Sequence, residues 1–122
     1  MPDQTIDTAW SAVAIMAKAP QSGEVKTRLC PPLSFDTAAQ LYRCFLLDKF
    51  AQVKALQRTT PVVSYSPADS RATFEALAPD HFVLIPQHGD DLGARILSTF
   101  EQLFRQGWGK HATLAQPKRQ AA

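Results

Sequence analysis

The chain has 122 residues, of which 45% are hydrophobic and 20% are charged, and its formal net charge is +2. This composition excludes collagen-like, disordered and low-complexity chains, and the length fits one domain with its own core. Three basic residues (Lys110, Lys118 and Arg119) and no acidic residue follow Gly109, so the charge excess belongs to this tail. We therefore expect no nucleic-acid partner, because such binding needs basic residues gathered on one folded face.

The cysteines and the N-terminal segment predict a cytoplasmic protein. Cys30 and Cys44 form no CxxC pair and are too few for a disulfide framework, so we expect both thiols to be reduced. The first residues are acidic, whereas a signal peptide begins with basic residues. The longest early apolar run, 12–17, is too short for a membrane span.

Apolar runs alternate with helical patterns along the chain, which predicts an open α/β fold. Short apolar runs predict strands at 11–17, 61–65 and 82–86. Apolar residues at spacings of three and four predict helices at about 34–56, with Ser34 as N-cap, and from 92 to about 106. A start signal at 66–69 and Pro79 as stop signal predict a short helix through Leu77. Strands that are buried on both faces and alternate with helices form a mostly parallel sheet with right-handed crossovers.

The sequence after residue 109 breaks this alternation. A fourth apolar strand is expected after the third helix, but 111–115 is only weakly apolar and 116–120 is polar. We therefore expect a folded part at 1–109 with about three βα units, followed by an aberrant or disordered tail at 110–122. A sheet of three strands leaves an edge exposed, and this edge is the surface we expect to form any homo-oligomer.

The loop after the first predicted strand is the strongest candidate binding site, because open α/β sheets bind ligands beyond the carboxyl ends of their strands. It carries Lys18, Lys26 and Arg28 around Gly23. Cationic side chains neutralise phosphate oxygens, and a glycine lets the backbone approach a ligand closely. The residues alone indicate either a phosphate-binding loop or a solvated basic loop.

Two well-known phosphate-binding motifs are excluded. A Walker A loop needs glycine immediately before Lys-Thr, but Val25 precedes Lys26-Thr27 in this chain. The dinucleotide fingerprint needs three glycines at fixed spacing, and the loop contains only Gly23.

Two separated motifs make the chain similar to a known family. The first is AIMAKAP at 14–20, followed by Gly23 and by VKTRL at 25–29; the second is QHGDDLGAR at 87–95. Together they resemble a bacterial GT-A-like family within the nucleotide-diphospho-sugar transferase superfamily, known as uncharacterised glycosyltransferases or selenodomain-associated transferases. The resemblance covers about residues 11–108 and implies a Rossmann-like three-layer domain. It also implies that the chain is the N-terminal, nucleotide-binding part of a longer member.

The resemblance implies a function and a set of site residues. The function is transfer of a sugar from a nucleotide-diphospho-sugar; the alternatives are nucleotidyl transfer and a non-catalytic nucleotide-binding or interaction protein. The residues implied to bind the phosphates are Lys18, Gly23, Lys26, Thr27 and Arg28. The residues implied to close around the base and ribose are Gln87, Gly89, Asp91 and Gly93.

The family also implies Mg²⁺ or Mn²⁺, held by the acid of a Gly-Ser-Asp-Ser-Pro stretch after the third helix. This chain has no acidic residue after Glu101, so we expect that metal ligand to be absent here and this chain alone to lack metal-assisted catalysis.

The start of the third predicted helix leaves alternatives open. We expect Asp90 to cap this helix, whereas Asp91 is compatible with either a cap or a ligand contact. Arg95 either contacts phosphate or pairs with Asp91, four residues earlier. The three histidines lack the spacing of metal ligands.

Overall fold

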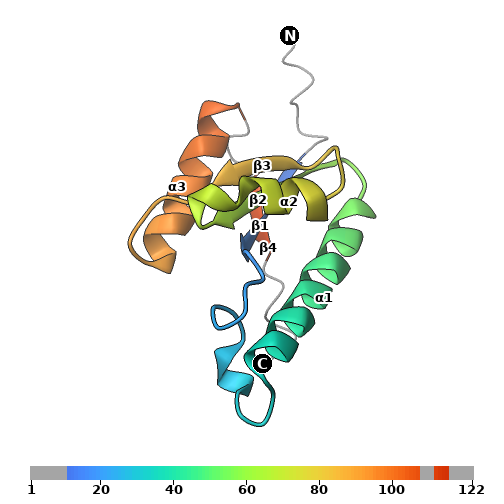
Figure 1. Ribbon diagram of the computed structural model, residues 1–122. Coiled ribbons are helices and arrows are strands. Elements are labelled where there is room, and N and C mark those ends of the chain that lie inside the picture. The colour runs from blue at the N-terminus through green and yellow to red at the C-terminus, as the bar shows by residue number, and fades with distance from the viewer. Residues whose placement is uncertain (1–10, 108–111, 116–122) are drawn as a thin grey trace.

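A parallel sheet of four strands organises the part of the chain that the computed structural model describes, residues 11–107 and 112–115 (Figure 1). The strands are β1 (Ser11–Lys18), β2 (Thr59–Ser66), β3 (Val83–Pro86) and β4 (Ala112–Ala115). Their order in the sheet is β3-β2-β1-β4, and each neighbouring pair is parallel. The predicted open α/β fold is therefore confirmed.

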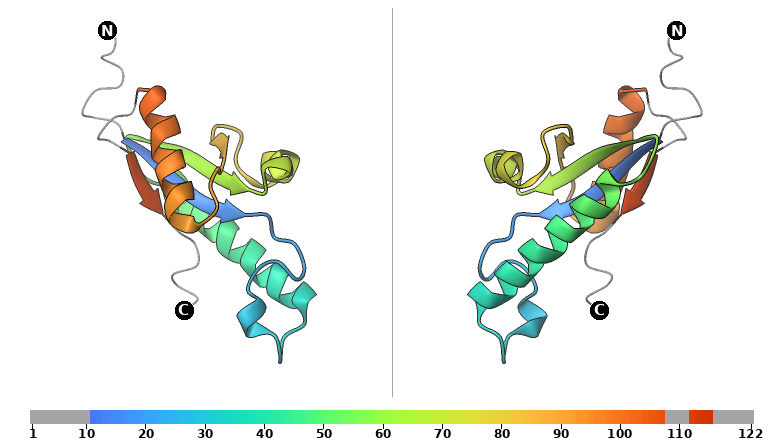
Figure 2. Two further views of the ribbon diagram at one scale, coloured as in Figure 1. Left: turned by 90° about the vertical axis from the view of Figure 1, so that its left-hand side faces the viewer. Right: turned by 90° about the vertical axis from the view of Figure 1, so that its right-hand side faces the viewer.

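Helices cover both faces of the sheet (Figure 2). The helix α1 (Phe35–Lys54) and the short helix α2 (Arg71–Leu77) lie on one face, and α3 (Leu92–Arg105) lies on the other. One-turn 3-10 helices, η2 (Thr27–Leu29) and η3 (Ala68–Ser70), precede α1 and α2. The result is the three-layer arrangement that the resemblance implies.

The apolar runs form strands because both of their faces are buried. All six residues of β1 from Ala12 to Ala17 are buried, with alternate side chains entering different cores. Ile15 packs against the α1 and α2 side, whereas Ala14 packs against the α3 side. This two-sided burial explains why the strand is continuously apolar rather than alternating.

The long helix begins where its cap predicts. Ser34 has extended backbone angles, and its hydroxyl accepts a hydrogen bond from the Thr37 N–H at 3.0 Å. Tyr42, Leu46 and Phe50 then follow at a spacing of four residues and are buried against the sheet.

A buried pair of hydroxyl groups attaches α3 to the sheet. The Oγ of Ser64 on β2 lies 2.7 Å from the Oγ1 of Thr99 on α3, and both residues are fully buried. Thr99 also donates to the carbonyl of Arg95, one turn earlier in the helix, at 2.9 Å. The helix is therefore held over the sheet by a directional contact as well as by apolar packing.

The weak stretch after the third helix forms a strand, contrary to the expectation for the tail at 110–122. Ala112–Ala115 pairs in parallel with residues 12–15 of β1. Strand pairing uses main-chain groups, so a central strand with a free side can pair even with a weakly apolar segment. The remainder of the predicted tail, 116–122, lies outside the described residues.

The outer edge of β3 is closed by side chains. Along a strand, the main-chain N–H and C=O groups of successive residues point alternately to the two sides. Because the N–H of Gln87 donates to β2, the main-chain groups of Leu84 and Pro86 point away from β2, toward the outer edge. The Leu84 carbonyl accepts from Arg71, Pro86 has no N–H, and the Pro86 carbonyl accepts from Gln102. No strand among the described residues pairs with the outer edge of β4.

No helix within residues 11–107 combines the length and the apolar character that crossing a membrane requires.

Candidate functional site

The strand order changes direction next to β1. The chain runs from β1 to β2 and β3 on one side, and then α3 crosses the opposite face to reach β4 on the other side of β1. Open α/β sheets bind ligands outside the carboxyl ends of the strands at such a reversal. The loop from 19 to 34 leaves β1 at this point, and η2 within it lies beside the first turns of α1 (Figure 2).

This loop is tied to the body of the domain at its start. The backbone N–H of Lys18 donates to the hydroxyl of Tyr42 on α1 at 3.0 Å, and the Lys18 ammonium donates to the Glu24 carbonyl at 3.3 Å. Val25, in the middle of the loop, is buried in the core. Burial raises the pKa of the Tyr42 hydroxyl, and the Lys18 hydrogen bond lowers it to a smaller extent.

The other predicted phosphate contacts follow at η2. Lys26 has a left-handed backbone with φ of 54°, and its ammonium lies 5.2 Å from the centre of the Phe45 ring on α1. This is a cation–π distance, so α1 restricts where the Lys26 side chain lies. Thr27 and Arg28 are exposed on the 3-10 turn itself. The three predicted cations therefore follow one another at the carboxyl end of β1, with Lys18 as the last residue of the strand and Lys26 and Arg28 on the loop.

The glycine of this loop is required by its backbone. Gly23 has a φ of +82°, a conformation that residues with side chains rarely adopt. A Cβ atom there would lie 3.9 Å from the Phe35 side chain, which is ordinary contact. Conformation rather than lack of space therefore explains the glycine.

Gln87 turns inward and joins two predicted loops. Its side-chain amide donates to the carbonyl of Ser64 on β2 at 2.7 Å and to the carbonyl of Ala17 on β1 at 3.2 Å. The loop after β3 thus reaches across β2 to the end of β1, next to Lys18. The two loops that the motifs single out lie at the same edge of the sheet. Both N–H groups of the Gln87 side-chain amide are engaged by main-chain carbonyls.

The start of α3 differs from the prediction in its cap. Asp91, not Asp90, caps the helix, since its Oδ1 accepts from the Ala94 N–H at 2.8 Å. Gly89 has a φ of +136°, and a Cβ there would lie 2.7 Å from the Cβ of Ala94, so glycine is required at this turn. Arg95 closes the same turn by donating from Nε to the Gly89 carbonyl at 3.1 Å.

Gly93 has a different environment. It lies in the first turn of α3, where a Cβ would meet only Asp91 Oδ1, at 3.5 Å, which is ordinary contact. The contacts of the described residues therefore do not require glycine at position 93. Glycine also costs about 1 kcal/mol relative to alanine in a helix.

The side chains that could bind a metal ion are dispersed in the described chain. Within residues 11–107, no three His, Cys, Asp or Glu side chains form a group that could hold one.

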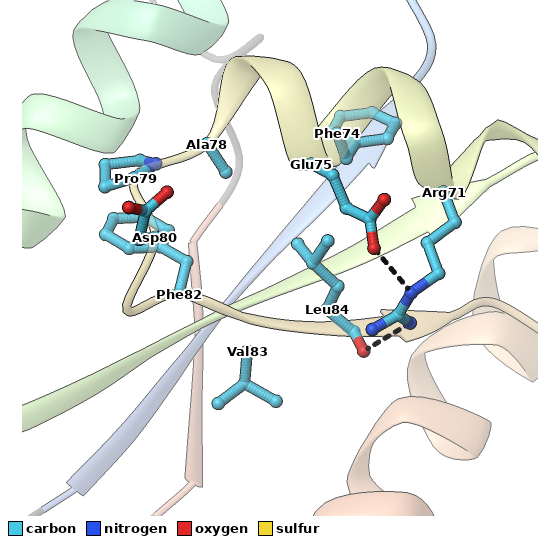
Figure 3. A pocket seen from close by; sticks show the side chains of 9 residues that line it. All are labelled: Arg71, Phe74, Glu75, Ala78, Pro79, Asp80, Phe82, Val83 and Leu84. Carbon is cyan, nitrogen blue, oxygen red and sulfur yellow. Dashed lines mark hydrogen bonds and ion pairs between the residues drawn. The ribbon is translucent and has the colours of Figure 1, made fainter.

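A hollow of about 360 Å³ lies between α2 and the segment that leads into β3, and no pattern in the sequence predicts it (Figure 3). Arg71 crosses one end of it, donating to Glu75 at 3.2 Å and to the Leu84 carbonyl at 3.4 Å. None of the predicted site residues lines this hollow.

Comparisons with known proteins give a structural match. No protein-family model matches the chain, and no curated protein matches it. The crystal structure of a "putative nucleotide-diphospho-sugar transferase" from Desulfovibrio desulfuricans G20 superposes with a TM-score of 0.79 at 32% sequence identity. The match covers 88% of this chain and 47% of that chain, so this chain spans about half the length of the solved protein.

Proposed function

We propose that this chain belongs to the nucleotide-diphospho-sugar transferase superfamily and that it binds the diphosphate of a nucleotide sugar with the loop that follows β1. One observation carries the proposal. Lys18 ends β1, and the loop that follows it carries Lys26 and Arg28, at the carboxyl edge of the sheet where the strand order reverses between β1 and β4. This is the place where open α/β folds bind ligands.

The charges of the loop suit a diphosphate. Lys26 and Arg28 are our principal candidates for contacts with phosphate oxygens, with Lys18 and Thr27 beside them and Gly23 shaping the turn. Charge-assisted hydrogen bonds are the strong ones, and phosphoryl chemistry depends mainly on positioning and charge stabilisation. Cations held on a tied loop supply both.

The loop after β3 is proposed to close on the base and ribose. Asp91 caps α3 with one carboxylate oxygen, Oδ1, and a carboxylate has a second oxygen that can accept a ribose hydroxyl. Gly89 fixes the shape of this turn, and Gly93 leaves the exposed start of α3 open to a ligand.

The reaction we propose is transfer of a sugar from its nucleotide carrier, in keeping with the name of the solved relative. The cations would stabilise the negative charge that develops on the departing diphosphate. Nucleotidyl transfer would use the same diphosphate contacts, so the acceptor and the bond that breaks distinguish the two reactions.

Binding is tested by thermal unfolding with a panel of nucleoside diphosphates, with and without Mn²⁺. Ligand at ten times its Kd stabilises the folded state by about 1.4 kcal/mol, which raises the Tm by several degrees. An unchanged Tm at millimolar ligand would refute the proposal.

Two matched variants test the assignment to the loop. Lys26→Ala should weaken binding about 10- to 100-fold, the range for one charged hydrogen bond. Lys54→Ala removes the same charge from the far end of α1 and should leave the Kd unchanged. Equal effects of the two substitutions would show that only overall charge matters.

A further inference from the structure

We propose that Gln87 is a positioning residue, which fixes the phosphate-binding loop relative to the loop after β3 and does not itself contact the nucleotide. The inference rests on the proposed function for its ligand, but its geometry is independent of any ligand. Gln87 is half-buried, and its one amide nitrogen donates to two carbonyls, those of Ala17 and Ser64, on two different strands.

The position of these acceptors explains the effect. Ala17 immediately precedes Lys18, where β1 ends and the cationic loop begins. Ser64 lies near the end of β2, and the backbone N–H of Gln87 also donates to the carbonyl of Tyr65 at 2.8 Å. Gln87 therefore joins the carboxyl ends of β1, β2 and β3 through one residue.

The amide group is suited to this task, because an amide nitrogen has two N–H groups and both acceptors are carbonyl oxygens. A ligand contact through the same nitrogen would have to displace one of these bonds and leave a main-chain carbonyl without its partner. Holding the two loops in place before binding lowers the ordering cost that the ligand must overcome.

The experiment uses two probes, inorganic pyrophosphate and a nucleoside diphosphate that the wild-type chain binds. Pyrophosphate lacks base and ribose, so it reports on the phosphate loop alone. Gln87→Leu removes both hydrogen bonds, and Gln87→Asn keeps the amide but shortens its reach by one methylene. Gln102→Leu is the matched control, since it also removes an amide hydrogen bond to a carbonyl, that of Pro86, without touching β1.

We expect both Gln87 variants to weaken both probes by a similar factor, about tenfold, the equivalent of one net hydrogen bond. Gln102→Leu should leave both Kd values unchanged. If a Gln87 variant weakens only the nucleoside diphosphate, Gln87 contacts base or ribose and the proposal is wrong. It is equally wrong if the Gln87 and Gln102 variants behave alike.

Amide hydrogen exchange separates this proposal from the binding proposal. Without any ligand, Gln87→Asn should accelerate exchange in the loop at 19–30, whereas Gln102→Leu should not. If the wild-type chain binds neither pyrophosphate nor any nucleoside diphosphate of the panel, the proposed function fails and the exchange result alone decides the role of Gln87. Unaltered exchange in that loop would then overturn the positioning role.

Discussion

Replacing Thr99 by valine should cost more stability than its small chemical change suggests. The substitution keeps the shape of the side chain and replaces the hydroxyl by a methyl group; Oγ1 of that hydroxyl lies 2.7 Å from Ser64 Oγ. Both residues are fully buried, so the Ser64 hydroxyl would lose its partner without gaining access to water. A buried polar group left unpaired costs about 1–3 kcal/mol.

Substitution of the partner residue, Ser64, should cost less stability for a structural reason. In Ser64→Ala, Thr99 keeps its hydrogen bond to the Arg95 carbonyl at 2.9 Å, so no buried hydroxyl is left unpaired. The expected loss is about 1 kcal/mol, the net value of one hydrogen bond. The double variant has neither hydroxyl, so its free energy of unfolding should also fall by about 1 kcal/mol. This decrease is smaller than the sum of the decreases in the two single variants.

The wild type, the two single variants and the double variant form a double-mutant cycle, which urea unfolding measures. The comparison requires that the slope of the free energy of unfolding against urea concentration is the same in all four proteins. We expect Thr99→Val to lose about 2 kcal/mol, and the two substitutions to couple by about the same amount. Additive losses, or a Thr99→Val loss no larger than that of Ser64→Ala, would refute the reasoning.

Four further outcomes follow from the structure. Gly89→Ala should destabilise by about 2 kcal/mol or more in urea, because its Cβ would lie 2.7 Å from the first turn of α3 and its φ is positive; a neutral substitution would contradict this. Asp91→Ala should lower the free energy of unfolding by about 1 kcal/mol through loss of the cap, whereas Asp90→Ala should change it little; equal losses would count against the cap. Burial raises the pKa of Tyr42, so the unfolded chain releases this proton first and stability falls as pH rises above about 10. Unfolding measured against pH should show a smaller alkaline loss for Tyr42→Phe, and an unchanged loss would argue against this assignment. Sedimentation should reveal weak self-association through the outer edge of β4; a strict monomer at all concentrations would exclude it.

The order of elements is predictable from the sequence because burial leaves a strong pattern. The run at 11–17 is apolar throughout, as a strand covered on both faces must be, and Ser34 marks the start of α1 through its hydroxyl. The loop with three cations and one glycine can be found in the same way, because it follows the end of such a run.

Other features depend on contacts that no local pattern encodes. The strand β4 pairs through main-chain groups, so its side chains gave little warning of it. Gln87 looks like an ordinary polar residue after a strand, yet it points inward because two carbonyls from distant segments lie within its reach. Both Asp90 and Asp91 suit a helix cap, and the choice depends on where the turn at Gly89 places the first helical residue.

The unequal margins of the sheet limit how large an assembly can grow. A strand added at the outer edge of β3 would compete with Arg71 and Gln102 for the outward carbonyls and would find no N–H at Pro86. Two molecules that met through β4 would place the β3 edge at both outer ends of the pair. Because that edge is the less favourable one for pairing, growth beyond two molecules in this direction is disfavoured.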